Sequence, residues 1–172
     1  TTLQKPILRA DLYRRLQSLG DVVPLAIAQP EPVKDRRRMR VLAAEDNRTN
    51  QLVFQKMVRE IDIDLAFANN GVEAVSLFQS FQPDMIFMDI SMPEMDGRDA
   101  ARAIRLLEAG HSHVPIVALT AHAMDGDAEG ILAAGIDRYM TKPLRKVVIS
   151  QTLSQFCPAD AYPIEVASEN AA

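Results

Sequence analysis

The stretch that decides the fold spans residues 85–97 and reads Met85-Ile86-Phe87-Met88-Asp89-Ile90-Ser91-Met92-Pro93-Glu94-Met95-Asp96-Gly97. Its first four residues are large and apolar, which is typical of a strand buried on both faces in a parallel sheet. The run ends at the carboxylate of Asp89, and Pro93 and Gly97 then break the regular structure. Because an unpaired buried carboxylate is costly, a charge at this strand end requires an explanation.

Polar side chains end three further apolar runs in the same way. They are the acids Glu45 and Asp46 after residues 41–44, the hydroxyl of Thr120 after residues 116–119, and the ammonium of Lys142 after residues 139–141. The carboxyl ends of parallel strands meet at one edge of a sheet, so these groups are expected to converge with Asp89 in one crevice. Three acids, a hydroxyl and a lysine indicate a site for a divalent cation and a phosphoryl group.

Apolar strands alternate with helical stretches from residue 39 onward. Strands are expected at residues 39–44, 63–68, 85–89, 115–120 and 138–141, and helices at residues 49–61, 71–81, 98–109, 124–134 and 144–156. Five repeats of strand and helix predict an α/β fold in which helices cover both faces of a parallel sheet.

Composition narrows the class of protein. The 172 residues are 48% hydrophobic and 24% charged, which is typical of a soluble globular domain. No window approaches the ~18 consecutive apolar residues of a membrane span, and there is no secretory signal. The single cysteine, Cys157, fits a reducing compartment, and the net charge of −4 argues against nucleic acid as the main partner. We expect a cytoplasmic protein without direct membrane contact.

Short motifs close the predicted strands in a fixed order. They are Glu45-Asp46-Asn47, Asp89 with Met92-Pro93 and Met95-Asp96-Gly97, Leu119-Thr120-Ala121, and Lys142-Pro143. Together they resemble the receiver domain of two-component signalling proteins, over residues 39 to about 156. The resemblance implies a flavodoxin-like (βα)5 three-layer sandwich with a five-stranded parallel sheet in the order 2-1-3-4-5.

The resemblance also implies a reaction, the transfer of a phosphoryl group from a phosphohistidine to Asp89. A carboxylate is a weak nucleophile and must approach another anion, so Mg²⁺ is the implied cofactor. Its implied ligands are Asp46, Asp89 and the backbone carbonyl of Ser91, with Glu45 acting mainly through water.

Further residues complete the implied catalytic set and switch. Lys142 would neutralise one phosphoryl oxygen, and Thr120 would donate a hydrogen bond to another. After phosphorylation of Asp89, Thr120 would swing towards it and Tyr139 would rotate inward to fill the space, a two-state shift that partners can distinguish. His122 either tunes the lifetime of the phosphoryl group or is an exposed residue at the rim.

Each motif also has a structural explanation when it is taken alone. The Glu45-Asp46 pair can favour the start of the next helix, and Asp89 can belong to a turn. Their conjunction at four strand ends favours the site. His111 and His113 could bind a metal, although two histidines without a third ligand are more often exposed loop residues.

The expected function is that of a phosphoacceptor in a phosphorelay, within a parent that is a hybrid sensor histidine kinase. The sequences of residues 44–51 and 119–124 resemble those of receiver domains attached to kinases. The partner would be a histidine kinase dimerisation/phosphotransfer domain or a histidine phosphotransfer protein, and a homodimer is a further option. No kinase ATP site is visible, so whether the chain itself counts as an enzyme stays open. The parent could tether the domain to the inner membrane.

Two other functions compete with this one. A receiver-like module could regulate a kinase by protein interaction without being phosphorylated, but the intact acids, threonine and lysine argue against that. A phosphatase of the haloacid dehalogenase type also uses an aspartate after a buried strand. It needs a second acid two residues later, where this chain has Ser91.

The flanks are expected to lie outside the alternating domain. Residues 1–19 align without a gap with the region that starts at Lys142, so we interpret them as the C-terminal helix remnant of a preceding receiver-like domain; chance similarity is the alternative. Their apolar stripe is expected to pack on the receiver core or on a second molecule. We expect residues 20–38 to form a linker and residues 157–172 to form a disordered tail. The chain starts without methionine, which suggests a piece of a longer protein.

Overall fold

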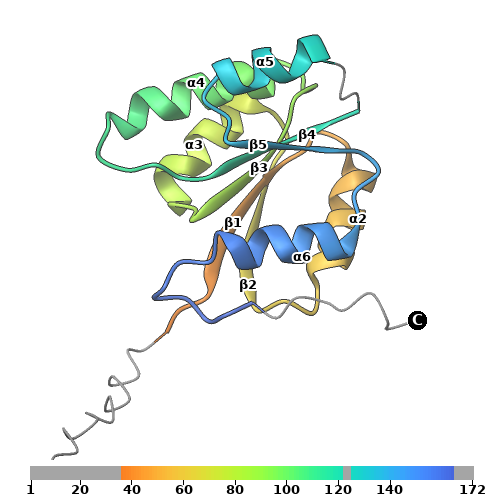
Figure 1. The fold of residues 1–172 in the computed structure, drawn as a ribbon, viewed down its shortest axis with the longest axis vertical. Coiled ribbons are helices and arrows are strands. Elements are labelled where there is room, and N and C mark those ends of the chain that lie inside the picture. The colour runs from red at the N-terminus through yellow and green to blue at the C-terminus, as the bar shows by residue number, and fades with distance from the viewer. Residues whose placement is uncertain (1–35, 122–124, 165–172) are drawn as a thin grey trace, which may run out of the picture. The chain divides into compact units, whose positions relative to one another are not determined.

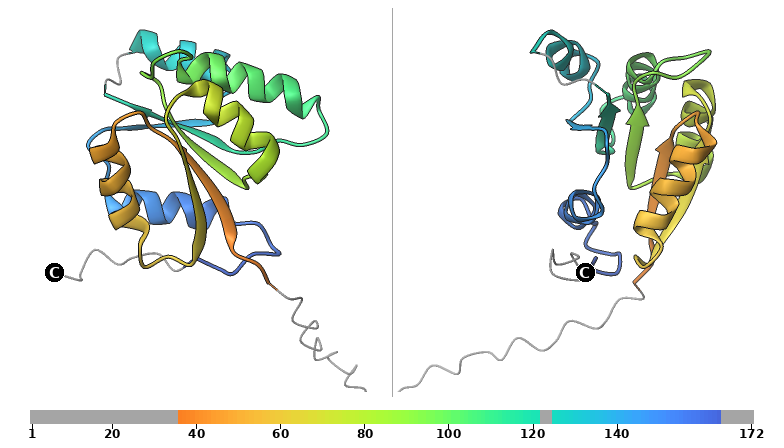
Figure 2. Two further views of the ribbon diagram at one scale, coloured as in Figure 1. Left: turned by 180° about the vertical axis from the view of Figure 1, so that it is seen from behind. Right: turned by 90° about the vertical axis from the view of Figure 1, so that its right-hand side faces the viewer.

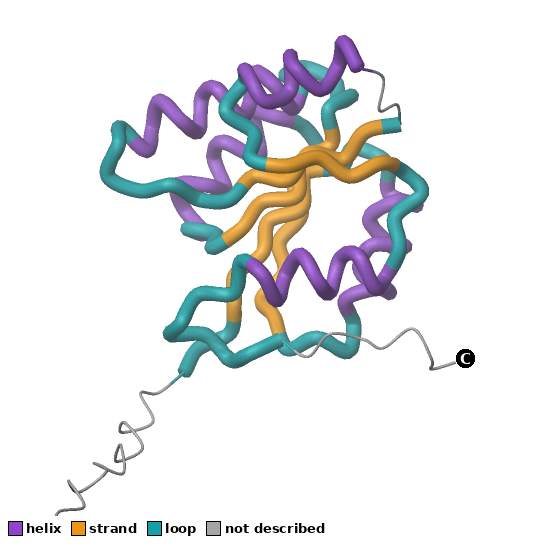
Figure 3. The backbone as a smooth tube through the Cα atoms, viewed as in Figure 1, coloured by secondary structure: helices purple, strands orange, loops and turns teal. Residues whose placement is uncertain are grey.

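The computed structural model describes residues 36–121 and 125–164. Within these residues, five strands alternate with five helices (Figure 1). The strands are β1 (Met39–Ala44), β2 (Ile63–Ala68), β3 (Met85–Asp89), β4 (Ile116–Thr120) and β5 (Arg138–Thr141). The helices are α2 (Arg48–Val58), α3 (Gly71–Phe81), α4 (Gly97–Glu108), α5 (Asp125–Ala133) and α6 (Lys146–Gln155). Figure 3 shows the loops through which β1, β2, β3 and β5 pass into the next helix.

The five strands form one parallel sheet in the order β2-β1-β3-β4-β5, which confirms the predicted flavodoxin-like topology. The register aligns the strand ends that carry the polar residues. Ala44, the residue before Glu45, pairs with Met88, and Asp89 pairs with Leu119. Thr120 pairs with Thr141, the residue before Lys142. The sheet therefore brings the ends of β1, β3, β4 and β5 to one edge.

Helices cover both faces of the sheet, as Figures 1 and 2 show. Successive side chains of a strand point to opposite faces, so β1 contributes to both halves of the core. Leu42 and Ala44 pack with buried residues of α3, α4 and α5. Val41 and Ala43 pack on the other face with buried residues of α2 and α6. Buried β3 is apolar up to Asp89 because it is covered on both faces.

Short polar side chains cap the first turns of α2, α3 and α4. Asn47 accepts hydrogen bonds from the backbone at the start of α2, Asn70 does so for α3, and Asp96 does so for α4. Such caps satisfy backbone N–H groups that have no partner within the helix. Gly97 is required by close approach, because a side-chain carbon there would lie 2.2 Å from the carbonyl oxygen of Asp89. The start of α4 is thus packed directly against the end of β3.

The folded domain extends beyond the predicted boundaries at both ends. Arg37 pairs with Ala161 in a parallel bridge, and Ala161 and Ile164 are buried against the half of the core that α2 and α6 cover. Described residues of the expected linker and of the expected tail therefore take part in the folded domain. The two segments lack periodicity, and they pair with each other although more than a hundred residues separate them in the sequence.

The remaining expectations about the flanks fall on residues 1–35 and 165–172, outside the described residues. This applies to the helix remnant and to most of the linker. Among the helices of the described residues, none is long and apolar enough to cross a membrane.

Candidate functional site

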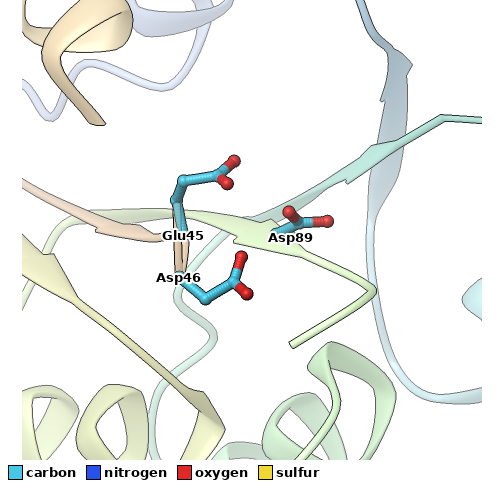
Figure 4. Close-up of side chains that lie close together, drawn as sticks. All are labelled: Glu45, Asp46 and Asp89. Atoms are coloured by element: carbon cyan, nitrogen blue, oxygen red, sulfur yellow. The ribbon is translucent and has the colours of Figure 1, made fainter. Parts of the chain in front are cut away.

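Three carboxylates gather where β1 and β3 end. Glu45 and Asp46 directly follow β1, and Asp89 is the last residue of β3, its neighbour in the sheet. Each acid offers an oxygen that lies within 4.8 Å of those of the other two. Figure 4 shows the three side chains around a shared space. Carboxylate oxygens at this spacing are suited to a hard divalent cation.

Lys142 reaches the same acids from the loop after β5. Its Nζ donates to Oδ2 of Asp89 at 2.6 Å and to Oε2 of Glu45 at 2.7 Å. Glu45 and Asp89 are both buried, so the two ion pairs are better shielded from solvent than surface pairs. The backbone N–H of Lys142 donates to the carbonyl of Thr120 at 2.8 Å, which ties its loop to the end of β4.

The combined effects of burial and the neighbouring charges shift the pKa values of both Asp89 and Lys142 upward. Burial raises the pKa of the Asp89 carboxyl, and the nearby charge of Glu45 adds to this, while the hydrogen bond from Lys142 opposes it. Burial acts to lower the pKa of Lys142, but its hydrogen bonds to Asp89 and Glu45 outweigh burial and raise it. Lys142 is therefore charged at neutral pH, and its single charge only partly compensates the three acids.

Thr120 and Ser91 lie beside Asp89. Thr120 is buried at the end of β4, one residue after the partner of Asp89 in the sheet. The backbone N–H of Ser91 donates to Oδ1 of Asp89 at 3.2 Å, so the first residues of the loop after β3 contact the carboxylate. The structure thus brings Lys142 and the three acids together, and Thr120 lies at the end of the strand next to β3.

Residues 41–154 match the family described as the response regulator receiver domain. The chain belongs to that family. Sensor protein GacS of Pseudomonas syringae pv. syringae is 38% identical over 157 residues, which are 89% of this chain and 17% of GacS. The chain thus spans a small part of this relative's length.

Solved receiver domains have the same fold. One is the receiver domain of a sensor histidine kinase of Pseudomonas aeruginosa PAO1 with a magnesium ion coordinated in its active-site cleft. It is 36% identical, with a TM-score of 0.64, over 69% of this chain and 97% of that one. Another is the receiver domain of the Saccharomyces cerevisiae response regulator Ssk1, solved with the histidine phosphotransfer protein Ypd1. It is 32% identical, with a TM-score of 0.66, over 70% of this chain and 90% of that one.

The remaining residues singled out in the sequence are Tyr139 and the three histidines. Tyr139 on β5 is 38% exposed, so its side chain is on the surface in this state. His122 falls outside the described residues. His111 is exposed. Nε2 of His113 lies 2.6 Å from Oδ1 of Asp137, the residue before β5. Among the described residues, Glu45, Asp46 and Asp89 form the one group of three or more potential metal ligands, and it contains no histidine.

Sequence reasoning missed two residues of α2 that contact Glu45. Nδ2 of Asn50 donates to Oε1 of Glu45 at 2.8 Å, and Nε2 of Gln51 donates to its backbone carbonyl at 2.6 Å. The signal was present for Gln51, because it lies on the same helical stripe as the buried residues Phe54 and Val58. A polar residue on a buried stripe requires hydrogen-bond partners.

Proposed function

We propose that this receiver takes a phosphoryl group from a phosphohistidine onto the carboxylate of Asp89, with Mg²⁺ as cofactor. The observation that carries the proposal is the pair of hydrogen bonds from Lys142 Nζ to Asp89 and Glu45, beside a third acid. An ammonium alone leaves this cluster short of positive charge. The cluster fits Mg²⁺ because its donors are hard oxygens on neighbouring strands. When bound, Mg²⁺ supplies the charge that lets an anionic phosphoryl group approach an anionic nucleophile.

The residues of the chain then have distinct roles in the transfer. An oxygen of Asp89 forms a bond to phosphorus while the bond from phosphorus to the histidine nitrogen breaks, and the electron pair of that bond stays on the imidazole. Lys142 moves from the acids to a phosphoryl oxygen and holds it as a point charge. Thr120 donates a hydrogen bond to a second oxygen. Asp46, Asp89 and the backbone carbonyl of Ser91 would hold the Mg²⁺ ion.

The switch follows from the same site. Thr120 turns towards the new phosphoryl group, and Tyr139 leaves its exposed position to fill the space behind it. Each state then presents a different surface around β5, and a partner shifts the equilibrium only by as much as its affinities for the two states differ.

The partner is a histidine phosphotransfer protein or the corresponding domain of a kinase. It has to bring its histidine to Asp89, so its docking surface must adjoin the site. On α2, Leu52 and Val53 are exposed apolar residues. Val53 also lines an apolar groove of about 330 Å³ that opens beside Glu45 and Lys142. We place the contact with the helix that carries the phosphohistidine on this exposed part of α2.

The parent protein is a hybrid sensor histidine kinase. The similarity to GacS supports this, and so does the similarity to a hybrid kinase of Dictyostelium discoideum, 38% identical over 125 residues. In such a parent the receiver works on the cytoplasmic side and receives its phosphoryl group from another domain.

Intact-protein mass spectrometry after incubation with acetyl phosphate and Mg²⁺ tests the proposal. Wild type should gain one phosphoryl group, and the gain should disappear with a chelator or in Asp89→Asn. A folded wild-type protein that gains none would favour an interaction module that is not phosphorylated. A gain that survives Asp89→Asn would identify another acceptor.

A further inference from the structure

Gln51 is a buried polar residue whose whole side-chain amide is engaged. It lies in the first turn of α2 and is 2% exposed. Its Nε2 donates to the carbonyl oxygen of Glu45 at 2.6 Å and to Oδ1 of Asn69 at 3.0 Å. Its Oε1 accepts a hydrogen bond from Nη1 of Arg48 at 3.1 Å. Both neighbours of Nε2 are oxygens, so the orientation of the amide is fixed by its partners.

The bond to the Glu45 carbonyl acts on the geometry of the acids. That oxygen belongs to the planar peptide that joins Glu45 to Asp46, so fixing it also fixes the Cα atom of Asp46. The preceding peptide is held separately, because the N–H of Glu45 donates to the carbonyl of Ala68 at 2.9 Å. Gln51 therefore determines the orientation of the peptide that follows β1 and the position of the Cα atom that carries the Asp46 side chain.

Asn69 continues this support into the loop after β2. Its Nδ2 and its backbone N–H both donate to Oε2 of Glu73, each at 2.8 Å. Because the amide nitrogen is used by Glu73, the amide oxygen of Asn69 is left facing Gln51. The backbone N–H of Glu73 in turn donates to Asn70, the cap of α3. A connected series of hydrogen bonds thus runs from the start of α3 to the peptide between the two acids.

We propose that Gln51 is a positioning residue for metal binding, which sets the Glu45–Asp46 peptide and braces it against the loop after β2 through Asn69. Partners behind the ligands of a metal orient those ligands, and their removal typically weakens metal affinity or activity by about 10- to 100-fold. Gln51 touches neither the metal nor the phosphoryl group, so its effect passes through Asp46 and Glu45. The inference rests on the proposed function, because it assumes that these acids bind Mg²⁺.

The decisive variant is Gln51→Met, which keeps the length and shape of the side chain but removes its hydrogen bonds. Isothermal titration calorimetry with Mg²⁺ should show affinity weakened about tenfold. Phosphorylation by acetyl phosphate should then need correspondingly more Mg²⁺, and its rate at saturating Mg²⁺ should approach that of wild type. A defect confined to the Mg²⁺ requirement separates positioning from damage to the acceptor itself.

Two variants of the same helix serve as controls. Gln55→Met removes an exposed glutamine of α2 and should leave Mg²⁺ affinity unchanged. Val58→Ala opens a cavity at the far end of α2, so it should lower thermal stability without changing Mg²⁺ affinity. If Val58→Ala weakens Mg²⁺ binding as much as Gln51→Met does, the effect reports general stability and the positioning role is refuted.

Asn69→Ala gives an independent test, because Asn69 is exposed and its loss should not prevent folding. It should weaken Mg²⁺ binding in wild type and have no further effect in the Gln51→Met background, since residues of one network are not additive. Additive effects, or wild-type affinity in Gln51→Met, would overturn the inference while leaving the proposed function intact. A wild type that binds no Mg²⁺ and is not phosphorylated would refute the proposed function and this inference together.

Discussion

Asp84 joins the two ends of the folded domain, and its removal should measurably destabilise the protein. Its carboxylate accepts hydrogen bonds from Nη1 and Nη2 of Arg37 at 2.6 and 2.8 Å, and from the backbone N–H of Arg40 at 2.7 Å. Nε of Arg37 also donates to Asp160 at 2.9 Å, so Arg37 connects the start of the domain to the segment after α6. Figure 1 shows these segments together at the end of β1 that is remote from the acids.

The expected loss can be built from the separate contacts. The Arg37 side chain is 37% exposed, so solvent screening limits its ion pair with Asp84 to about 1 kcal/mol. The backbone N–H of Arg40 loses a charged acceptor, which is worth about 1.5 kcal/mol. Asp84→Ala should therefore lower the free energy of unfolding by about 2–3 kcal/mol. Asp84→Asn keeps an acceptor for Arg40 and should lose only about 1 kcal/mol.

The loss should depend on pH in one direction. Burial opposes the ionisation of Asp84, but the hydrogen bonds from Arg37 and Arg40 outweigh it and lower the pKa of the carboxyl. The stabilisation is therefore present above the unfolded pKa of about 3.9 and is lost as the pH falls through the lower folded value. The difference between wild type and Asp84→Asn should be full at pH 7 and disappear at pH values below both pKa values.

Urea unfolding followed by far-UV circular dichroism measures these differences, since the chain has no tryptophan. If both variants unfold at the wild-type midpoint at pH 7, the contacts between the two ends contribute nothing. If the loss in Asp84→Asn is the same at pH 3 as at pH 7, charge is not its cause.

Three further predictions concern the site and its docking surface. Lys142→Met should slow phosphorylation of Asp89 by acetyl phosphate roughly a hundredfold, because a charge that stabilises the transition state is lost. Its Mg²⁺ affinity, measured by calorimetry, should not fall. A wild-type rate of phosphorylation would exclude the role of Lys142. Gly97→Ala should destabilise the protein by about 1–3 kcal/mol in urea unfolding, because the new methyl group meets the Asp89 carbonyl, and an unchanged midpoint would contradict the close approach. Val53→Glu should slow transfer from a phosphorylated histidine phosphotransfer protein but not from acetyl phosphate. Leu106→Glu, which changes an exposed residue of α4, should affect neither rate. Equal rates for the two variants with the protein donor would refute the docking surface.

Much of the fold could be predicted because its signals are local. The run of residues 85–88 identifies a strand covered on both faces, and β1, β2, β3 and β5 have the bounds that the sequence predicted. α3 also has the predicted bounds, whereas the ends of the other helices differ from the predicted ones by one to three residues. The expected helix at residues 49–61, for example, begins one residue earlier and ends at Val58. The strand order came from the resemblance to receivers, since periodicity does not encode which strands are neighbours.

The sequence by itself determined which residues end the strands, and a parallel sheet is enough to bring Glu45, Asp46 and Asp89 to one edge. Only the tertiary structure decided their partners. The Lys142 ammonium spans Glu45 and Asp89, Gln51 holds the peptide between the two acids, and Arg37 pairs with a segment more than a hundred residues away. Strand and helix patterns record which side of an element faces the core. Contacts between remote side chains depend on how the elements pack, and no local pattern records that.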